Sequence, residues 1–107
     1  MSNENELKLE KLRDDMRIVT ADIIKLVQKR MGIASEIGNI KDNLMMKIED
    51  ISVEQDIARY VHELGTQIGL NNEFIGKLLN LLLLESINIQ KAKTSKKEQS
   101  WIIWPCS

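Results

Sequence analysis

The stretch Leu26–Lys41, LVQKRMGIASEIGNIK, determines how the rest of this sequence is interpreted. Its apolar residues recur alternately three and four positions apart, and the same spacing extends upstream and downstream, as in a helical seam. The seam contains Leu9, Leu12, Met16, Val19, Ile23, Leu26, Ile33, Ile37, Ile40 and Leu44. Arg30 stands where the pattern calls for another apolar residue. The spacing predicts one long helix, from about residue 5 to about residue 43.

Two shorter helices are predicted downstream. The second is expected to begin at Ser52, a typical N-cap residue, and to end before Gly69, because glycine readily leaves the helical conformation. The third is expected to start at Asn71 or Asn72 and to end near residue 92. The predicted fold class is therefore all-α, with one long and two shorter helices.

The seam of the long helix needs more cover than this chain supplies. Each of the shorter helices is about half as long as the first, so together they cannot bury its whole apolar face. A second copy of the chain is the economical cover. We therefore predict an intertwined helical homodimer.

Glycines at two positions inside the long helix have two interpretations. Gly32 and Gly38 weaken a helix relative to alanine, or they mark places where another element approaches the backbone closely.

Composition excludes several classes of function. Hydrophobic residues make up 43% and charged residues 29% of the 107 residues, as in soluble globular proteins, and the net charge of −1 argues against nucleic-acid binding. No apolar run is long enough to span a bilayer, and the N-terminus has no signal core, so we expect a cytoplasmic protein without a membrane partner. With one histidine, His62, and one cysteine, Cys106, we expect no metal and no cofactor.

Arg30 requires an anion. An isolated buried charge costs several kcal/mol, and arginine cannot lose its proton to avoid that cost. The anion is either an internal carboxylate or a ligand. Lys41 lies 11 residues after Arg30, about three turns, with Ile33, Ala34 and Ile37 between them on that face. Two cations flanking an apolar floor suit a compact ligand with an apolar body and negative ends.

Further polar residues are candidates for the same pocket. Glu54 falls in the first turn of the second helix, and Ser86 and Gln90 are four residues apart on one face of the third. Each has a simpler explanation. Glu54 can interact with the helix dipole, and Ser86 and Gln90 can be polar residues at a fraying end.

Five segments in order carry a resemblance to a known family. They are LEKLRDDM (9–16), VQKRMGIASEIGNIK (27–41), EDISVEQD (49–56), GLNNEFIGKLL (69–79) and ESINIQ (85–90). Over about residues 6–91 the chain resembles the all-helical chorismate mutases, which are small intertwined dimers. The resemblance implies rearrangement of chorismate to prephenate in phenylalanine and tyrosine biosynthesis, without metal or cofactor.

The resemblance also implies roles for individual residues. Arg13 matches an arginine that reaches into the partner's site and binds a substrate carboxylate, and Arg30 one that binds a carboxylate in its own site. Lys41 and Gln90 match the residues that hydrogen-bond the ether oxygen of the breaking bond. Arg13 and Arg30 lie 17 residues apart at different azimuths, so one helix cannot easily direct both into one pocket. An antiparallel pair of long helices can.

Three more residues follow from the same resemblance, with one departure. Asp50 and Glu54 match an acidic pair near the ring hydroxyl, and Ser86 matches a hydroxyl that helps to seat a carboxylate. Val53 stands where some members carry another arginine, so we expect an effect on binding more than on the chemistry.

Two other functions remain open at this point, together with the role of the tail. One is an isochorismate-pyruvate lyase of the same fold, and the other is a non-catalytic helical dimer or scaffold. Residues 1–93 are predicted to form the mutase-like domain, and residues 94–107, which contain both tryptophans, a tail without an assigned role. The remaining length leaves no room for a second enzyme, so we expect a monofunctional chain.

Overall fold

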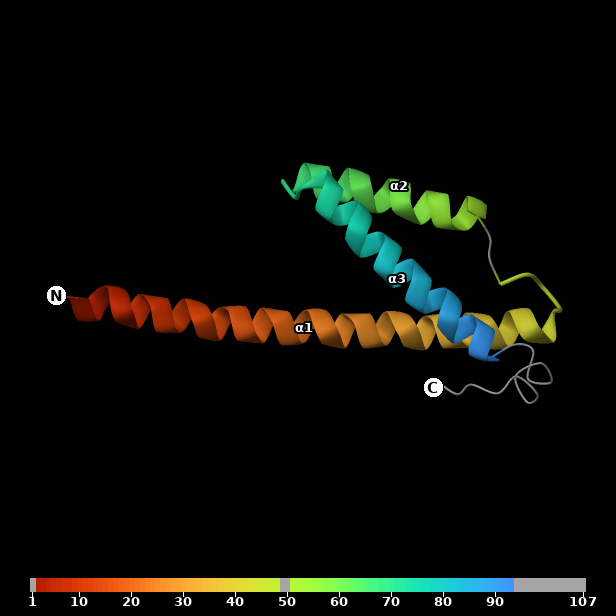
Figure 1. The fold of residues 1–107 in the computed structure, drawn as a ribbon, viewed down its shortest axis with the longest axis horizontal. Helices are drawn as coiled ribbons and strands as arrows, with labels where there is room; N and C mark the ends of the chain where they lie inside the picture. The colour runs from red at the N-terminus through yellow and green to blue at the C-terminus, as the bar shows by residue number, and fades with distance from the viewer. Residues whose placement is uncertain (1, 49–50, 94–107) are drawn as a thin grey trace, which may run out of the picture. The chain divides into compact units, whose positions relative to one another are not determined.

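The computed structural model describes residues 2–48 and 51–93, and in this part of the chain it contains three helices and no strand. They are α1 (Ser2–Asn43), α2 (Ile51–Gln67) and α3 (Asn72–Lys93) (Figure 1). The predicted all-α class, with one long and two shorter helices, is confirmed. No described helix combines the length and the apolarity needed to cross a bilayer. The tail at 94–107 lies outside the described residues.

Helix α1 begins at Ser2, earlier than predicted. Glu4 lies in its first turn, where a carboxylate is favoured by the helix dipole. Side-chain pairs one turn apart also support this part of the helix. Lys11 bonds to Asp15 at 3.4 Å, and such exposed pairs contribute a few tenths of a kcal/mol each. The polar start of the chain therefore continues the helix and does not cap it.

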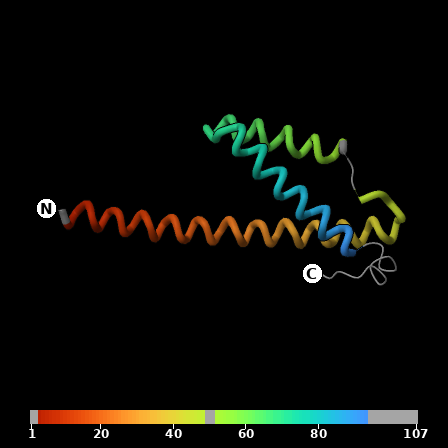
Figure 2. The backbone as a smooth tube through the Cα atoms, viewed as in Figure 1, coloured from red at the N-terminus to blue at the C-terminus, as the bar shows by residue number. Residues whose placement is uncertain are grey.

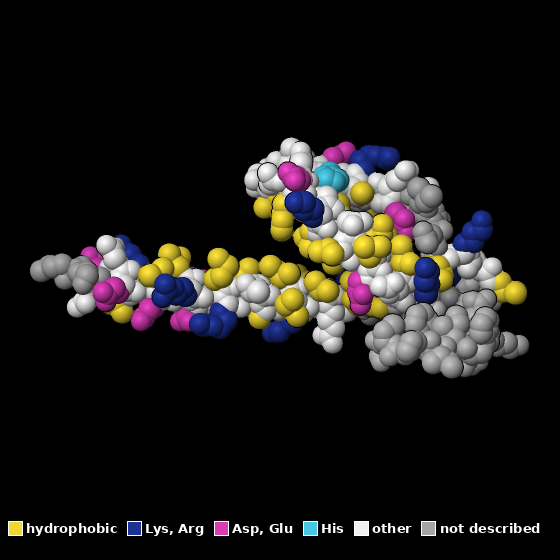
Figure 3. Space-filling model, viewed as in Figure 1, with side chains coloured by type: hydrophobic (Ala, Val, Ile, Leu, Met, Phe, Trp, Pro, Cys, Tyr) yellow, Lys and Arg dark blue, Asp and Glu magenta, His cyan; other side chains and the backbone are white. Residues whose placement is uncertain are grey.

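The described chain divides into two compact units. The first unit comprises residues 2–30 and is the N-terminal part of α1 alone, and the second comprises residues 31–48 and 51–93. In the first unit the seam side chains are at least 47% exposed, and Figure 3 shows hydrophobic side chains along it. They are Leu9, Leu12, Met16, Val19, Ile23 and Leu26. A single helix has no core of its own, so this apolar face has no cover within its unit.

In the second unit, α2 and α3 pack side by side and antiparallel, joined by a short turn (Figure 2). The two helices approach each other closely at Gly65, where an added Cβ would lie 2.1 Å from Cδ1 of Ile75. Ile75 is among the most buried side chains, with 4% exposed. Glycine at position 65 therefore allows α3 to approach α2.

We expect Gly65→Ala to destabilise the fold by about 1–3 kcal/mol, because the new methyl overpacks against Ile75. Urea unfolding followed by circular dichroism measures the change. Gly76→Ala is the matched control, since among the described residues its Cβ would meet only His62, at 3.9 Å, which is an ordinary contact. The control should be more stable than wild type by about 0.5–1 kcal/mol, because alanine has a higher helix propensity than glycine. Equal effects at the two positions would contradict the packing explanation.

Helices α1 and α2 each end in a hydrogen-bonded turn of the same type. After α2, Leu70 N–H donates to Gly65 O at 2.9 Å, and Gly69 adopts a φ of 85° and donates to Thr66 O at 3.2 Å. This is a Schellman motif, and it confirms the predicted stop at Gly69. After α1, Met45 occupies the equivalent left-handed position with a φ of 56°. Its ending is completed by Met46 N–H, which donates to the carbonyl of Lys41 at 2.8 Å.

Met45→Gly should stabilise the protein by about 1 kcal/mol, because the left-handed conformation is unfavourable for a residue with a Cβ. Thermal unfolding is the measurement. Met46→Gly, at the next position, is the control and should be neutral or destabilising, since glycine there only adds entropy to the unfolded chain. A lower melting temperature for Met45→Gly than for Met46→Gly would count against the strain at Met45.

The first residues of α2 and α3 correct one prediction and refine another. Asn71 Oδ1 accepts the backbone N–H of Phe74 at 2.9 Å, so Asn71 is the N-cap of α3. Helix α2 begins at Ile51, one residue before the predicted cap, so the prediction that Ser52 is an N-cap was wrong. Ile51 continues a helix readily, and Glu54 lies in the first turn, where the dipole favours a carboxylate.

Candidate active site

The last turns of α1 and α3 are in contact within the second unit. A Cβ added at Gly38 would lie 3.0 Å from Cα of Gln90 and 3.2 Å from Cβ of Lys93. Earlier on both helices, Ser86 Oγ lies 4.0 Å from Sδ of Met31. Met31 precedes Gly38 on α1, and Ser86 precedes Gln90 on α3. The two helices therefore run in the same general direction where they cross (Figure 1). The close approach predicted as one interpretation of Gly38 is confirmed.

Gln90 is buried at this crossing, with 8% of its surface exposed. Its Oε1 atom is buried and has no hydrogen-bond partner among the described residues. Leaving a buried polar atom unpaired costs about 1–3 kcal/mol, which is rarely tolerated without a reason. The amide therefore has bonding capacity that this part of the chain does not use.

Ser86 lies one turn before Gln90 and is also buried, with 6% exposed. The prediction that the two residues share one face of α3 is confirmed by this common burial. The alternative, that they are polar residues of a fraying end, was wrong, because a fraying end is solvent-exposed.

Lys41 lies about one turn after Gly38, on the side of α1 that meets α3, and is half-buried. Its ammonium donates a hydrogen bond to the carbonyl oxygen of Ile48, in the elbow after α1. No carboxylate of the described residues forms an ion pair with Lys41. An ammonium has three N–H donors, so the bond to Ile48 orients the side chain and leaves two donors for a ligand.

The remaining candidates of the second unit are less fully defined. Glu54 is half-buried at the start of α2, and its side chain forms no hydrogen bond or ion pair with another described residue. Val53 is exposed. Asp50 lies outside the described residues. In the predicted apolar floor, Ala34 is buried with 4% exposed, whereas Ile37 remains exposed.

The two arginines belong to the first unit. Arg13 is exposed and forms no ion pair within the described part of the chain. Arg30 is half-buried, at the last position of this unit. The structure therefore groups Lys41, Ser86 and Gln90 on neighbouring turns of α1 and α3 in the second unit. Both arginines belong to the other unit.

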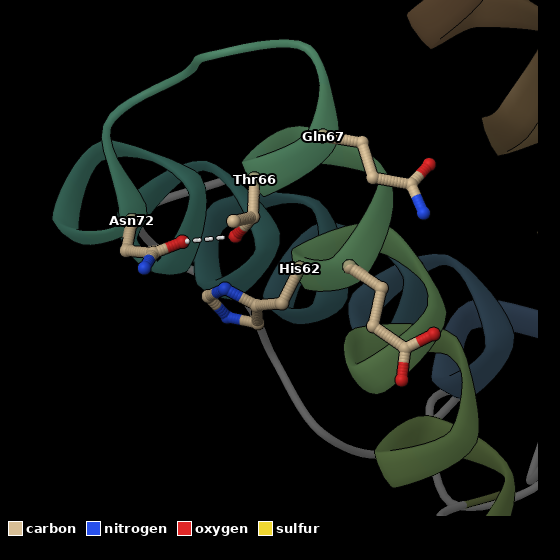
Figure 4. Close-up of a pocket in the computed structure, with 5 residues that line it drawn as sticks. His62, Thr66, Gln67 and Asn72 are labelled. Atoms are coloured by element: carbon tan, nitrogen blue, oxygen red, sulfur yellow. Dashed lines mark hydrogen bonds between the residues drawn. The ribbon is translucent and has the colours of Figure 1, made fainter.

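An open pocket lies elsewhere in the second unit, at the turn between α2 and α3 (Figure 4). Its lining residues are His62, Glu63, Thr66, Gln67 and Asn72. Thr66 Oγ1 donates to Asn72 Oδ1 at 3.1 Å across the turn. None of the predicted site residues lines this pocket, and no three His, Cys, Asp or Glu side chains of the described residues are placed to hold a metal ion.

Comparison with known proteins identifies the family. Residues 12–91 match the family described as chorismate mutase type II. The chain belongs to this family. The matched range runs from just before Arg13 to just after Gln90, so it includes every residue predicted for the site.

Two curated relatives are both described as bifunctional chorismate mutase/prephenate dehydratase, from Buchnera aphidicola. In the subspecies Acyrthosiphon pisum (strain APS) the identity is 29% over 84 residues, which are 78% of this chain and 22% of the relative. In the subspecies Schizaphis graminum (strain Sg) it is 27% over 96 residues, which are 90% of this chain and 24% of the relative. This chorismate mutase type II chain thus spans under a quarter of the relatives' length. No solved structure matches.

Proposed function

We propose that the protein is a chorismate mutase, which converts chorismate to prephenate in the biosynthesis of phenylalanine and tyrosine. The observation that carries this proposal is the family match over residues 12–91. The crossing of α1 and α3 supports it, because two potential donors, Lys41 and Gln90, are carried on neighbouring turns there.

The reaction is an intramolecular rearrangement in which one C–O bond breaks while one C–C bond forms. It requires no nucleophile and no proton transfer. The substrate is a flexible dianion that reacts only from a folded, chair-like shape. Binding both carboxylates selects that shape and removes the rotational freedom that slows the reaction in water. We assign the carboxylates to Arg13 and Arg30, because a guanidinium binds a carboxylate through two parallel hydrogen bonds.

Electrostatic stabilisation supplies the rest of the proposed rate enhancement. As the C–O bond breaks, negative charge develops on the ether oxygen. We assign Lys41 and the amide N–H of Gln90 as the donors to that oxygen. Gln90 is almost fully excluded from water, and donors fixed in such an environment stabilise developing charge strongly. The carbonyl of Ile48 holds Lys41 before substrate binds, so little reorganisation is needed at the moment of reaction.

Three residues are assigned to the periphery of the substrate. Asp50 and Glu54 are proposed to lie near the ring hydroxyl, and the Glu54 carboxylate is proposed to accept its hydrogen bond. A Glu54 side chain without a partner among the described residues suits that role. Ser86 is proposed to donate to a carboxylate.

The active form is proposed to be an intertwined homodimer in which Arg13 enters the partner's site. The support is the exposed seam of the first unit, where Leu12 and Met16 have exposed fractions of 63% and 68%. Contiguous apolar surface of this kind is unfavourable in water and marks an interaction site. A second copy offers an identical seam of matching length, as isologous interfaces require.

An ultraviolet assay of chorismate loss by the purified protein tests the proposed function. We expect saturable conversion to prephenate. A well-folded protein that leaves chorismate at the uncatalysed rate would overturn the proposal. Release of pyruvate from isochorismate, without turnover of chorismate, would assign the chain to the lyase activity instead.

A further inference from the structure

Gly38 is a point of close approach between α1 and α3. It is buried, and a Cβ built there would lie 3.0 Å from Cα of Gln90 and 3.4 Å from its Cβ. A separation of 3.0 Å is tighter than nine in ten real Cβ contacts, so one helix would have to move by a few tenths of an ångström. Gly32 lies on the same helix, and a Cβ there would meet no atom of the described residues within 4 Å.

The atoms that face Gly38 are important because they cannot rotate away. The nearest is the Cα of Gln90, which belongs to the backbone of α3, and a second is the Cβ of Lys93 at 3.2 Å. A flexible side chain could accommodate an added methyl by changing its rotamer, whereas a backbone atom moves only with its helix. A side chain at position 38 therefore displaces the section of α3 that carries Gln90.

The position of the Gln90 side-chain amide depends on the position of the α3 backbone. Its Oε1 has no hydrogen-bond partner in the described part of the chain, so no bond to this oxygen anchors the amide. Lys41, near the end of α1, is held independently by a hydrogen bond to the carbonyl of Ile48 in the elbow that follows the helix. The distance between the two donors is thus set by how closely α3 packs on α1 at Gly38.

We propose that Gly38 is a positioning residue for Gln90: the absence of a side chain at position 38 sets the α1–α3 spacing that brings the Gln90 amide to its place beside Lys41. This inference rests on the proposed function, in which both side chains donate to one ether oxygen. Two donors converge on one atom only within a narrow range of separations, because hydrogen bonds weaken steeply with poor geometry. Gly38 itself touches no substrate in this arrangement.

The test compares Gly38→Ala with Gly32→Ala in the full chain. Both variants exchange glycine for alanine in α1, and only the first meets a neighbour. We expect Gly38→Ala to lower kcat for prephenate formation by about five- to tenfold, with KM changed less than about twofold, because a small misplacement acts on the transition state more than on binding. Gly32→Ala should keep the wild-type kcat and melt a few degrees higher. Full activity of Gly38→Ala would overturn the proposal.

A double-variant cycle separates positioning of Gln90 from a general effect on the fold. Gln90→Ala removes the amide but keeps the Cα and Cβ that Gly38 faces. If Gly38 acts through Gln90, adding Gly38→Ala to Gln90→Ala should leave kcat unchanged within about twofold. A further five- to tenfold loss on that background would show that Gly38 acts elsewhere, and would also overturn the proposal.

Two controls keep the result interpretable. If Gly38→Ala does not fold by circular dichroism, adding Lys93→Gly removes the contact to the Cβ of Lys93 and keeps the contacts to the Cα and Cβ of Gln90. Failure of this variant to fold would overturn the proposal, because Gly38 would then serve folding alone. Wild-type protein without mutase activity would remove the proposed function and this inference together, whereas active wild type with active Gly38→Ala removes only the inference.

Discussion

Replacing Lys41 by alanine is expected to lower kcat for prephenate formation by about 10²- to 10³-fold while leaving the helices intact. This is the effect typical of removing one preorganised donor from a developing oxyanion. The ammonium is bound to a neutral carbonyl, that of Ile48, and to no carboxylate of the described residues. Loss of the side chain therefore leaves no unpaired carboxylate within the described part of the fold.

Steady-state kinetics by ultraviolet absorbance measures the loss, and circular dichroism tests the fold. Lys41→Met is the second variant, because it keeps most of the aliphatic stem and removes only the charge and the donors. It should be as slow as Lys41→Ala. Lys47→Ala is the matched control, since this exposed lysine lies in the same elbow and should be fully active. Near-normal turnover by Lys41→Met would exclude Lys41 as a donor to the ether oxygen.

The helices were predictable from sequence because each has a strong local cause. The three-and-four spacing of apolar residues predicts α1, and the ends at Gly69 and Asn71 follow from the backbone freedom of glycine and the acceptor oxygen of asparagine. The turn at Met45 has no such signal, because methionine has no preference for the left-handed conformation. The turn is stabilised there by the hydrogen bond that Met46 N–H donates to the carbonyl of Lys41.

The site was predictable only as far as single helices determine it. That Ser86 and Gln90 share a face follows from their spacing of four, and their burial confirms it. Gly32 and Gly38 look alike in sequence, and only the packing of α3 on one of them distinguishes the two. The bond from Lys41 to Ile48 likewise depends on how the elbow folds back, which no periodicity encodes. The proposal that a second chain brings Arg13 into the site stays a prediction, because the sequence and the structure of one chain do not test it.

The second large effect is expected at the arginines of the proposed shared site. Arg13→Ala and Arg30→Ala should each lower kcat/KM by roughly 10- to 100-fold, since each removes a charge-assisted bond to a substrate carboxylate worth about 1.5–3 kcal/mol. Arg17→Ala is the matched control, because this arginine lies one turn from Arg13 and pairs with Asp14 on the surface of α1. It should retain full activity.

Mixing the two impaired variants tests whether a site takes one arginine from each chain. In a mixed dimer, the Arg13→Ala chain keeps its own Arg30 and receives Arg13 from its partner, so one of the two sites is complete. Random exchange makes about half of the dimers mixed, so about a quarter of all sites, and of the wild-type activity, should return. The mixture is assayed after denaturation and refolding together, with each variant refolded alone as the control. If both arginines served a site from the same chain, no combination would restore a complete site, and the mixture would stay as slow as its components.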